Sequence, residues 1–181
     1  MAQYGRPVSD KADDGNWSST DTSEGSPVFF SAIDESSASD SDYITGDGSA
    51  GSAIQLDVEL TNGLGDPGVT TGHKLIYRYN TDAGSSDASL MVRLMEGATV
   101  RMSETLDVSG VSSYTTRTYA PTNTTGTISS YDAVFLRFIF EDTETMDNVY
   151  ISQAYLEIPN AAAGSDAVPM ALNTYQQMRN K

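Results

Sequence analysis

The chain of 181 residues contains no cysteine, which excludes disulfide bonds, thiolate metal sites and cysteine nucleophiles. Histidine is nearly absent as well. Because His73 is the only histidine, the chain can build neither a multi-histidine metal site nor a triad that needs a second imidazole. The residue stands at the very start of the expected strand 73–79, and this position favours a packed or capping role over a catalytic one.

Positive charge is the next scarcity, with ten Lys and Arg residues against 25 Asp and Glu residues and a formal net charge of −15. The basic residues occur singly along the chain. Binding to a phosphate backbone depends on clustered cations that release counterions, and this chain has no such cluster. Neither nucleic acid nor an anionic membrane is therefore an expected partner. A basic protein surface or a divalent cation fits the negative field better.

Long apolar runs are also missing, since none approaches the roughly 20 residues that span a bilayer. The first fifteen residues, MAQYGRPVSDKADDG, lack the apolar centre of a secretory signal. We expect the mature chain to start near its first residue. No nucleophile elbow of the form G-x-S-x-G occurs either. Residue chemistry therefore predicts a binding or structural protein and no enzyme.

What the chain does have is a strict alternation of apolar and polar residues, which predicts strands with one buried face. In 53–61, four aliphatic side chains alternate with polar ones, and within the predicted strand 132–141 residues 134–140 are apolar on both faces except at Arg137. The second pattern predicts a strand that is central in its sheet or lies under an interface. Turn-forming residues separate the predicted strands, which are 53–61, 73–79, 89–95, 98–106, 113–119, 132–141 and 148–158.

The number of strands predicts the fold class. Two or three further short strands are expected within the acidic first 52 residues, giving eight to ten in all. This number suits an all-β protein, an antiparallel jelly-roll β-sandwich with a C-terminal extension. Residues 1–159 are expected to form one domain with acidic N-terminal loops.

Residues 160–181 differ in composition from the rest and are predicted to be a linker followed by a C-terminal arm or a short helix. Apolar residues there recur at loosely helical spacing behind a capping Asp166. The segment from residue 1 to about 16 is interpreted as a second arm. Such arms can become ordered when they contact a partner.

Contact residues are predicted from side chains that point away from the core. In 89–95, the alternation leaves Met91, Arg93 and Met95 outside. Methionines of this kind either form a contact surface or fill gaps. The candidate interface residues are these three together with four from the tail, Met170, Leu172, Tyr175 and Met178.

Three alternatives concern small ligands. Oxygen ligands for a structural calcium ion could come from the Asp-rich segments 34–47 and 141–147, although no EF-hand loop is present and solvated loops are the default interpretation. Trp17 and the ten tyrosines could include a platform on which sugars stack, but Tyr77 and Tyr79 share a strand face and are more typical of a core edge. Two carboxylates across a cleft would be needed for glycoside hydrolysis, a condition that any acidic chain meets by chance. No cofactor is predicted, and the metal content is undetermined.

Several short strings occur in an order that resembles a module found among the structural proteins of tailed bacteriophages. They cover roughly residues 5–159 and read GRP at 5–7, GNW at 15–17, AIDE at 32–35, DSDYI at 40–44, DPG at 66–68, GHKLIYRY at 72–79, VRLMEG at 92–97 and AYLEIP at 154–159. The resemblance is one of pattern and includes no catalytic residues. None is carried over to this chain.

This resemblance implies a jelly roll on a virion. The expected function is that of a head decoration, or cement, protein, which is made in the host cytoplasm and binds the major capsid protein on the capsid surface, where it stabilises the shell. Such proteins commonly assemble as homotrimers. The absence of a long repetitive shaft favours the head over a fibre. The alternative is a carbohydrate-binding domain of a tail fibre or spike, or a secreted binding module, and a jelly-roll hydrolase or lyase ranks third.

Overall fold

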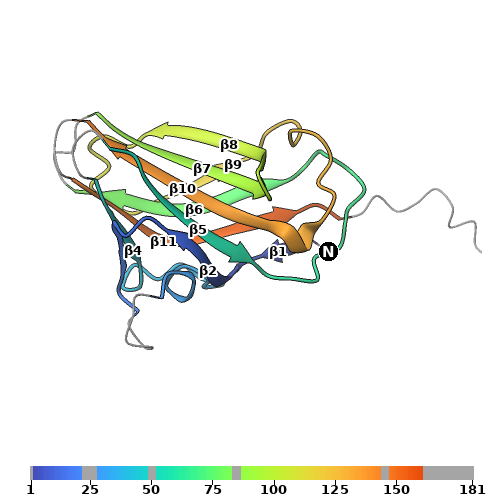
Figure 1. Cartoon of the computed structure of the whole chain (residues 1–181), viewed down its shortest axis with the longest axis horizontal. Helices are drawn as coiled ribbons and strands as arrows, with labels where there is room; N and C mark the ends of the chain where they lie inside the picture. Colours follow the sequence, from blue (N-terminus) through green and yellow to red (C-terminus); the bar gives the residue numbers. More distant parts are fainter. Residues whose placement is uncertain (1, 22–27, 49–51, 83–86, 144–146, 161–181) are drawn as a thin grey trace, which may run out of the picture.

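The computed structural model describes residues 2–21, 28–48, 52–82, 87–143 and 147–160. Within these ranges the chain forms strands and two single-turn 3-10 helices, η1 (Phe30–Ala32) and η2 (Tyr131–Ala133). Figure 1 shows the strands arranged in two layers. In chain order the strands are β1 (Gln3–Gly5), β2 (Pro7–Asp13), β3 (Trp17–Ser19), β4 (Ile44–Asp47), β5 (Ile54–Leu60), β6 (Lys74–Thr81), β7 (Ala88–Glu96), β8 (Thr99–Asp107), β9 (Thr115–Tyr119), β10 (Val134–Asp142) and β11 (Asn148–Ile158).

The strands pair in two antiparallel sheets. Sheet A has the order β3-β4-β11-β6-β9, with β1 also paired to β11, and sheet B has the order β2-β5-β10-β7-β8. Every described pairing is antiparallel. Apart from the consecutive pairs β3–β4 and β7–β8, neighbours in each sheet are not consecutive in the chain, which is the connectivity of a jelly roll. The protein is thus an antiparallel jelly-roll β-sandwich, as the alternating pattern predicts.

The core lies between the two sheets and is built from the inward residues of the alternating strands. On β10, Leu136, Phe138 and Phe140 are fully buried, and β5 contributes Leu56 and Val58 from the neighbouring position. Each large side chain buried in this way stabilises the fold by about 1.5–3 kcal/mol. Strand β10 lies between β5 and β7 at the centre of sheet B, so the central position predicted for 132–141 is confirmed.

The seven strands predicted after residue 52 are present with ends that differ by at most two residues. A tight turn at Gly97 joins β7 to β8, and Gly97 has a φ of 57°. A left-handed conformation of this kind suits glycine because it has no Cβ.

The prediction for the first 52 residues is wrong in two respects. The described residues of this segment form four strands instead of two or three, and residues 3–13 are paired in both sheets through β1 and β2 instead of forming an arm. The pairing of β2 with β5 shifts register twice, between Pro7 and Ser9 and between Asp10 and Ala12. Such bulges interrupt the alternation on which the prediction depends.

The C-terminal segment predicted over 160–181 lies outside the described residues beyond Asn160, and so do its interface candidates Met170, Leu172, Tyr175 and Met178. Helical structure in the described ranges is confined to η1 and η2. Neither is long or apolar enough to cross a membrane.

Candidate functional site: a tyrosine-lined hollow on sheet A

The outer face of sheet A carries several tyrosines because of an irregularity in β11. The pairing of β11 with β6 shifts register between Ile151 and Gln153. Before this bulge the odd-numbered residues of β11 point to the core, and after it the even-numbered residues do so, as the buried Val149 and Leu156 show. Tyr150 therefore lies on the outer face, as does Tyr155 farther along the strand.

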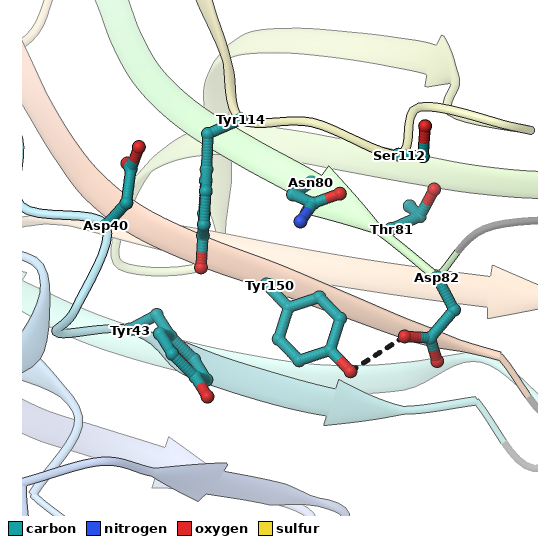
Figure 2. A pocket seen from close by; sticks show the side chains of 8 residues that line it. All are labelled: Asp40, Tyr43, Asn80, Thr81, Asp82, Ser112, Tyr114 and Tyr150. Atoms are coloured by element: carbon teal, nitrogen blue, oxygen red, sulfur yellow. Dashed lines mark hydrogen bonds between the residues drawn. The ribbon is translucent and has the colours of Figure 1, made fainter.

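A hollow of about 390 Å³ opens on this face beside Tyr150. Figure 2 shows its wall, to which β6, β11 and three loops contribute side chains. The size lies within the roughly 300–1,000 Å³ range of small-molecule sites in proteins. Most of the lining side chains are polar, which favours a ligand rich in hydroxyl groups. The lining residues are Asp40, Tyr43, Asn80, Thr81, Asp82, Ser112, Tyr114 and Tyr150.

Three aromatic rings border the hollow. The rings of Tyr43 and Tyr150 meet edge to face, with centroids 5.4 Å apart and planes at 85°. Tyr114 enters from the loop before β9, and in Figure 2 its hydroxyl points toward the other two tyrosines. The guanidinium of Arg78 lies 5.5 Å from the centroid of the Tyr114 ring. These contacts hold the rings in place and leave them at the border of the hollow.

Carboxylates flank the rings on two sides. Asp82, just after β6, accepts a hydrogen bond of 2.8 Å from the hydroxyl of Tyr150, drawn in Figure 2. It also accepts two from Asn148, one from the backbone amide and one from the side chain. Asp40 is held by Arg78 through two hydrogen bonds of 2.7 Å. Each carboxylate retains lone pairs, so both can accept further hydrogen bonds from a ligand.

Asn80 is the least satisfied polar group of the hollow. It lies on β6 directly opposite Tyr150 of β11 in the sheet register. Its Oδ1 is buried and has no hydrogen-bond donor among the described residues. A buried unpaired acceptor costs about 1–3 kcal/mol. A ligand hydroxyl that reached this amide, after a rotation about its terminal torsion, would supply the missing donor.

The ionisation states follow from these surroundings. Burial raises the pKa of the Tyr114 phenol, and the nearby Tyr43 and Asp40 raise it further. Burial likewise raises the pKa of Tyr150, with a further contribution from its hydrogen bond to Asp82. The hydrogen bond from Arg78 lowers the pKa of Asp40. At neutral pH the two phenols are therefore neutral and can donate a hydrogen bond, whereas Asp40 is an ionised acceptor.

Three of the ten tyrosines considered for a sugar platform border this hollow, but the aromatic residues considered by name, Trp17, Tyr77 and Tyr79, do not. Trp17 is 5 % exposed and belongs to the core, and Tyr77 and Tyr79 point into the core as well. The sequence reasoning missed Tyr43, Tyr114 and Tyr150 as a group, because two of them lie in loops and the third depends on the bulge in β11. No periodic pattern in the sequence brings them together.

Among the described residues, no three His, Asp or Glu side chains lie close enough together to hold a metal ion. Within the Asp-rich segment 34–47, Asp40 is engaged by Arg78. His73 is buried, and its Nε2 lies 2.5 Å from the hydroxyl of Tyr131. This is the packed role that the sequence favours.

The interface candidates of β7 lie on the other sheet. Met91 and Arg93 are partly exposed on the outer face of sheet B, as the alternation predicts. Met95 is only 3 % exposed, so it offers little contact surface. A register shift between Leu94 and Met95 in the pairing with β8 accompanies this burial.

The sequence matches no protein-family model and no curated protein. Solved structures are similar in fold. An arabinose-bound GH51 α-L-arabinofuranosidase matches with a TM-score of 0.52 and 14 % identity over 83 % of this chain, and this chain spans only 25 % of the enzyme's length. A family 29 carbohydrate-binding module matches with a TM-score of 0.44 and 12 % identity, covering 95 % of this chain and 98 % of the module. The C-terminal CBM6 of the laminarinase LamC from Zobellia galactanivorans gives 0.45 and 12 %, covering 87 % and 100 %.

At these identities the similarities show a shared β-sandwich fold and no more. They offer no support for the capsid-decoration function, so the major capsid protein as partner, the virion as location and the homotrimer all stay predictions. The structural neighbours are jelly-roll sandwiches that include carbohydrate-binding modules.

Proposed function

We propose that this protein is a non-catalytic carbohydrate-binding β-sandwich that holds a short oligosaccharide in the hollow of sheet A. The observation that carries the proposal is the combination of three tyrosine rings with Asn80 and Asp82 around one cavity. Aromatic rings offer flat apolar faces to the C–H groups of a sugar, while the amide and carboxylates pair with its hydroxyls.

The negative charge around the hollow favours neutral sugars over anionic ones as ligands. Asp40 is ionised, Asp82 serves as an acceptor, and the whole chain carries −15. A uronic acid or sulfated sugar would bring a further negative charge against these groups. Arg78, which lies against the Tyr114 ring, is already held by Asp40.

The test is isothermal titration of the full chain with neutral oligosaccharides, namely cellohexaose, xylohexaose, mannohexaose and β-1,4-galactotriose. We expect at least one to bind and Tyr114→Ala and Asn80→Ala to weaken it by at least about tenfold, which is 1.4 kcal/mol. Tyr4→Ala is the matched control, because Tyr4 is 47 % exposed on the same sheet and lies outside the hollow. The proposal fails if no sugar binds or if all three variants bind like the wild type.

A further inference from the structure

The outer face of sheet B presents an unpaired cation in a chain that has an excess of carboxylates. Of the eight Lys and Arg residues in the described ranges, six form ion pairs. Arg6 donates to the backbone oxygens of Asp34 and Glu35. The Arg93 side chain forms no ion pair and donates no hydrogen bond among the described residues, and its Nε is buried without an acceptor. Such an unpaired group costs free energy that a partner could recover.

The surroundings of Arg93 are those of a protein interface. On β10 and β7, the outward residues next to it in the register are Arg137, Ile139 and Met91. Arg137 donates two hydrogen bonds of 2.8 and 2.7 Å to Asp57. The Asp57 carboxylate is therefore already paired and does not serve Arg93. Methionine, aromatic residues and arginine are the side chains enriched at interface centres.

The same face also carries an unpaired anion. Glu141 is exposed near the end of β10 and makes no hydrogen bond or ion pair within the described part of the chain. It pairs in register with Ser89, two rows beyond the row that holds Arg93 and Arg137. The row between them is the pair Ile139 and Met91. Each row is about 6.6 Å from the next, so Arg93 and Glu141 are about 13 Å apart along the strands, too far for a pair within one chain.

This spacing is self-complementary, and we propose that two copies of the chain associate through the outer faces of sheet B. A two-fold axis that lies between the two faces and crosses the row of Ile139 and Met91 brings Arg93 of each copy opposite Glu141 of the other. In such an isologous contact, residue i meets residue j and residue j meets residue i. Ile139 and Met91 then pack against their own counterparts at the centre.

The available area lies at the lower end of the range for standard protein interfaces, about 600–1,000 Å² on each partner. The face is five strands wide, and three of them have nine residues. The other two, β2 and β5, have seven, so with strands about 4.8 Å apart and a rise of about 3.3 Å per residue the face covers roughly 650 Å². A standard interface buries about 800 Å² on each partner. The two reciprocal ion pairs also offset the electrostatic repulsion between two acidic chains. Salt at about 0.15 M screens this repulsion between charges more than about 8 Å apart.

The experiment is sedimentation equilibrium of the full chain at about 0.15 M salt, with charge variants of both residues. We expect the wild type to form a dimer and Arg93→Glu and Glu141→Arg each to raise the dimer dissociation constant by at least about tenfold. The double variant Arg93→Glu with Glu141→Arg restores opposite charges and should recover the dimer. Lys74→Glu, a matched charge reversal on sheet A, should leave association unchanged.

Three results would overturn this arrangement: a wild-type chain that stays monomeric up to about 1 mM, a trimer, or single variants that associate as well as the wild type. The circular dichroism spectrum of each variant separates loss of association from loss of folding. The test involves sheet B alone, so its outcome is independent of sugar binding on sheet A.

Discussion

The phenol of Tyr77 on β6 donates a hydrogen bond of 2.7 Å to Oε2 of Glu104 on β8, linking sheet A to sheet B. The other carboxylate oxygen, Oε1, accepts a hydrogen bond of 3.0 Å from Nε of Arg117 on β9. Because β8 and β9 are the last strands of their sheets, the contact closes one edge of the sandwich. Burial, together with Glu104, raises the pKa of Tyr77, so its phenol remains a donor.

Removing this donor should destabilise the protein. Tyr77→Phe leaves one oxygen of Glu104 without its buried donor, and we expect the free energy of unfolding to fall by about 1.5–3 kcal/mol. Urea denaturation measures the change. Tyr79→Phe is the matched control on the same strand, because no described residue is hydrogen bonded to its hydroxyl, and it should change stability by less than about 0.5 kcal/mol. Equal effects of the two variants would contradict the role given to Glu104.

The close packing of Gly46 gives a second prediction. A Cβ at this position would lie 3.0 Å from Cδ1 of Ile54 and 3.0 Å from Cη2 of Trp17, both in the core. Gly46→Ala should therefore overpack the core and lower the free energy of unfolding by about 1–3 kcal/mol. A thermal melt followed by Trp17 fluorescence would detect both the loss and any shift of the indole. Thr45→Ser, a change on the outward face of the same strand, should have a much smaller effect.

The buried histidine gives a prediction for pH dependence. Burial lowers the pKa of His73 below its ordinary value of about 6.5, and this effect outweighs the opposing contributions of the Thr70 backbone and Asp66. As pH falls through about 6.5, the unfolded chain takes up a proton at this residue and the folded chain does not. The unfolded state then binds more protons, so the free energy of unfolding falls toward acid pH.

His73→Phe removes this titration while leaving the carboxylates unchanged. Urea denaturation at about pH 7.5 and about pH 5 should show a larger loss of stability in the wild type than in the variant. The quantity to compare is the change in the free energy of unfolding between the two pH values, measured for each protein. In the variant Tyr131 lacks its polar partner at both pH values, so this effect cancels in the comparison. Equal losses would mean that His73 accepts a proton in the folded state.

The sequence predicts the sandwich well because burial imposes a period of two on its strands. Apolar residues on both faces of 134–140, except at Arg137, correctly predict that β10 lies at the centre of a sheet. The short strands β1 and β3 escape prediction because three residues cannot establish a period.

The candidate site escapes prediction for a different reason. A strict alternation along 148–158 would put Tyr150 and Tyr155 on opposite faces, and the bulge after Ile151 places both outside. Tyr43 and Tyr114 lie in irregular segments, where no periodicity indicates which way a side chain points. The identity of an aromatic residue is also uninformative, since Trp17 and Tyr77 are buried in the core.

The most direct test of sugar binding at the hollow is to follow the backbone amide resonances of the ¹⁵N-labelled chain while xylohexaose or another of the four neutral oligosaccharides is added. Binding at the proposed site predicts the largest shifts at Tyr43, Asn80 and Tyr114, with little change at Met91 and Arg93 on sheet B. Shifts centred on sheet B, or no shifts with any of the four sugars, would contradict the assignment of the hollow as a carbohydrate site.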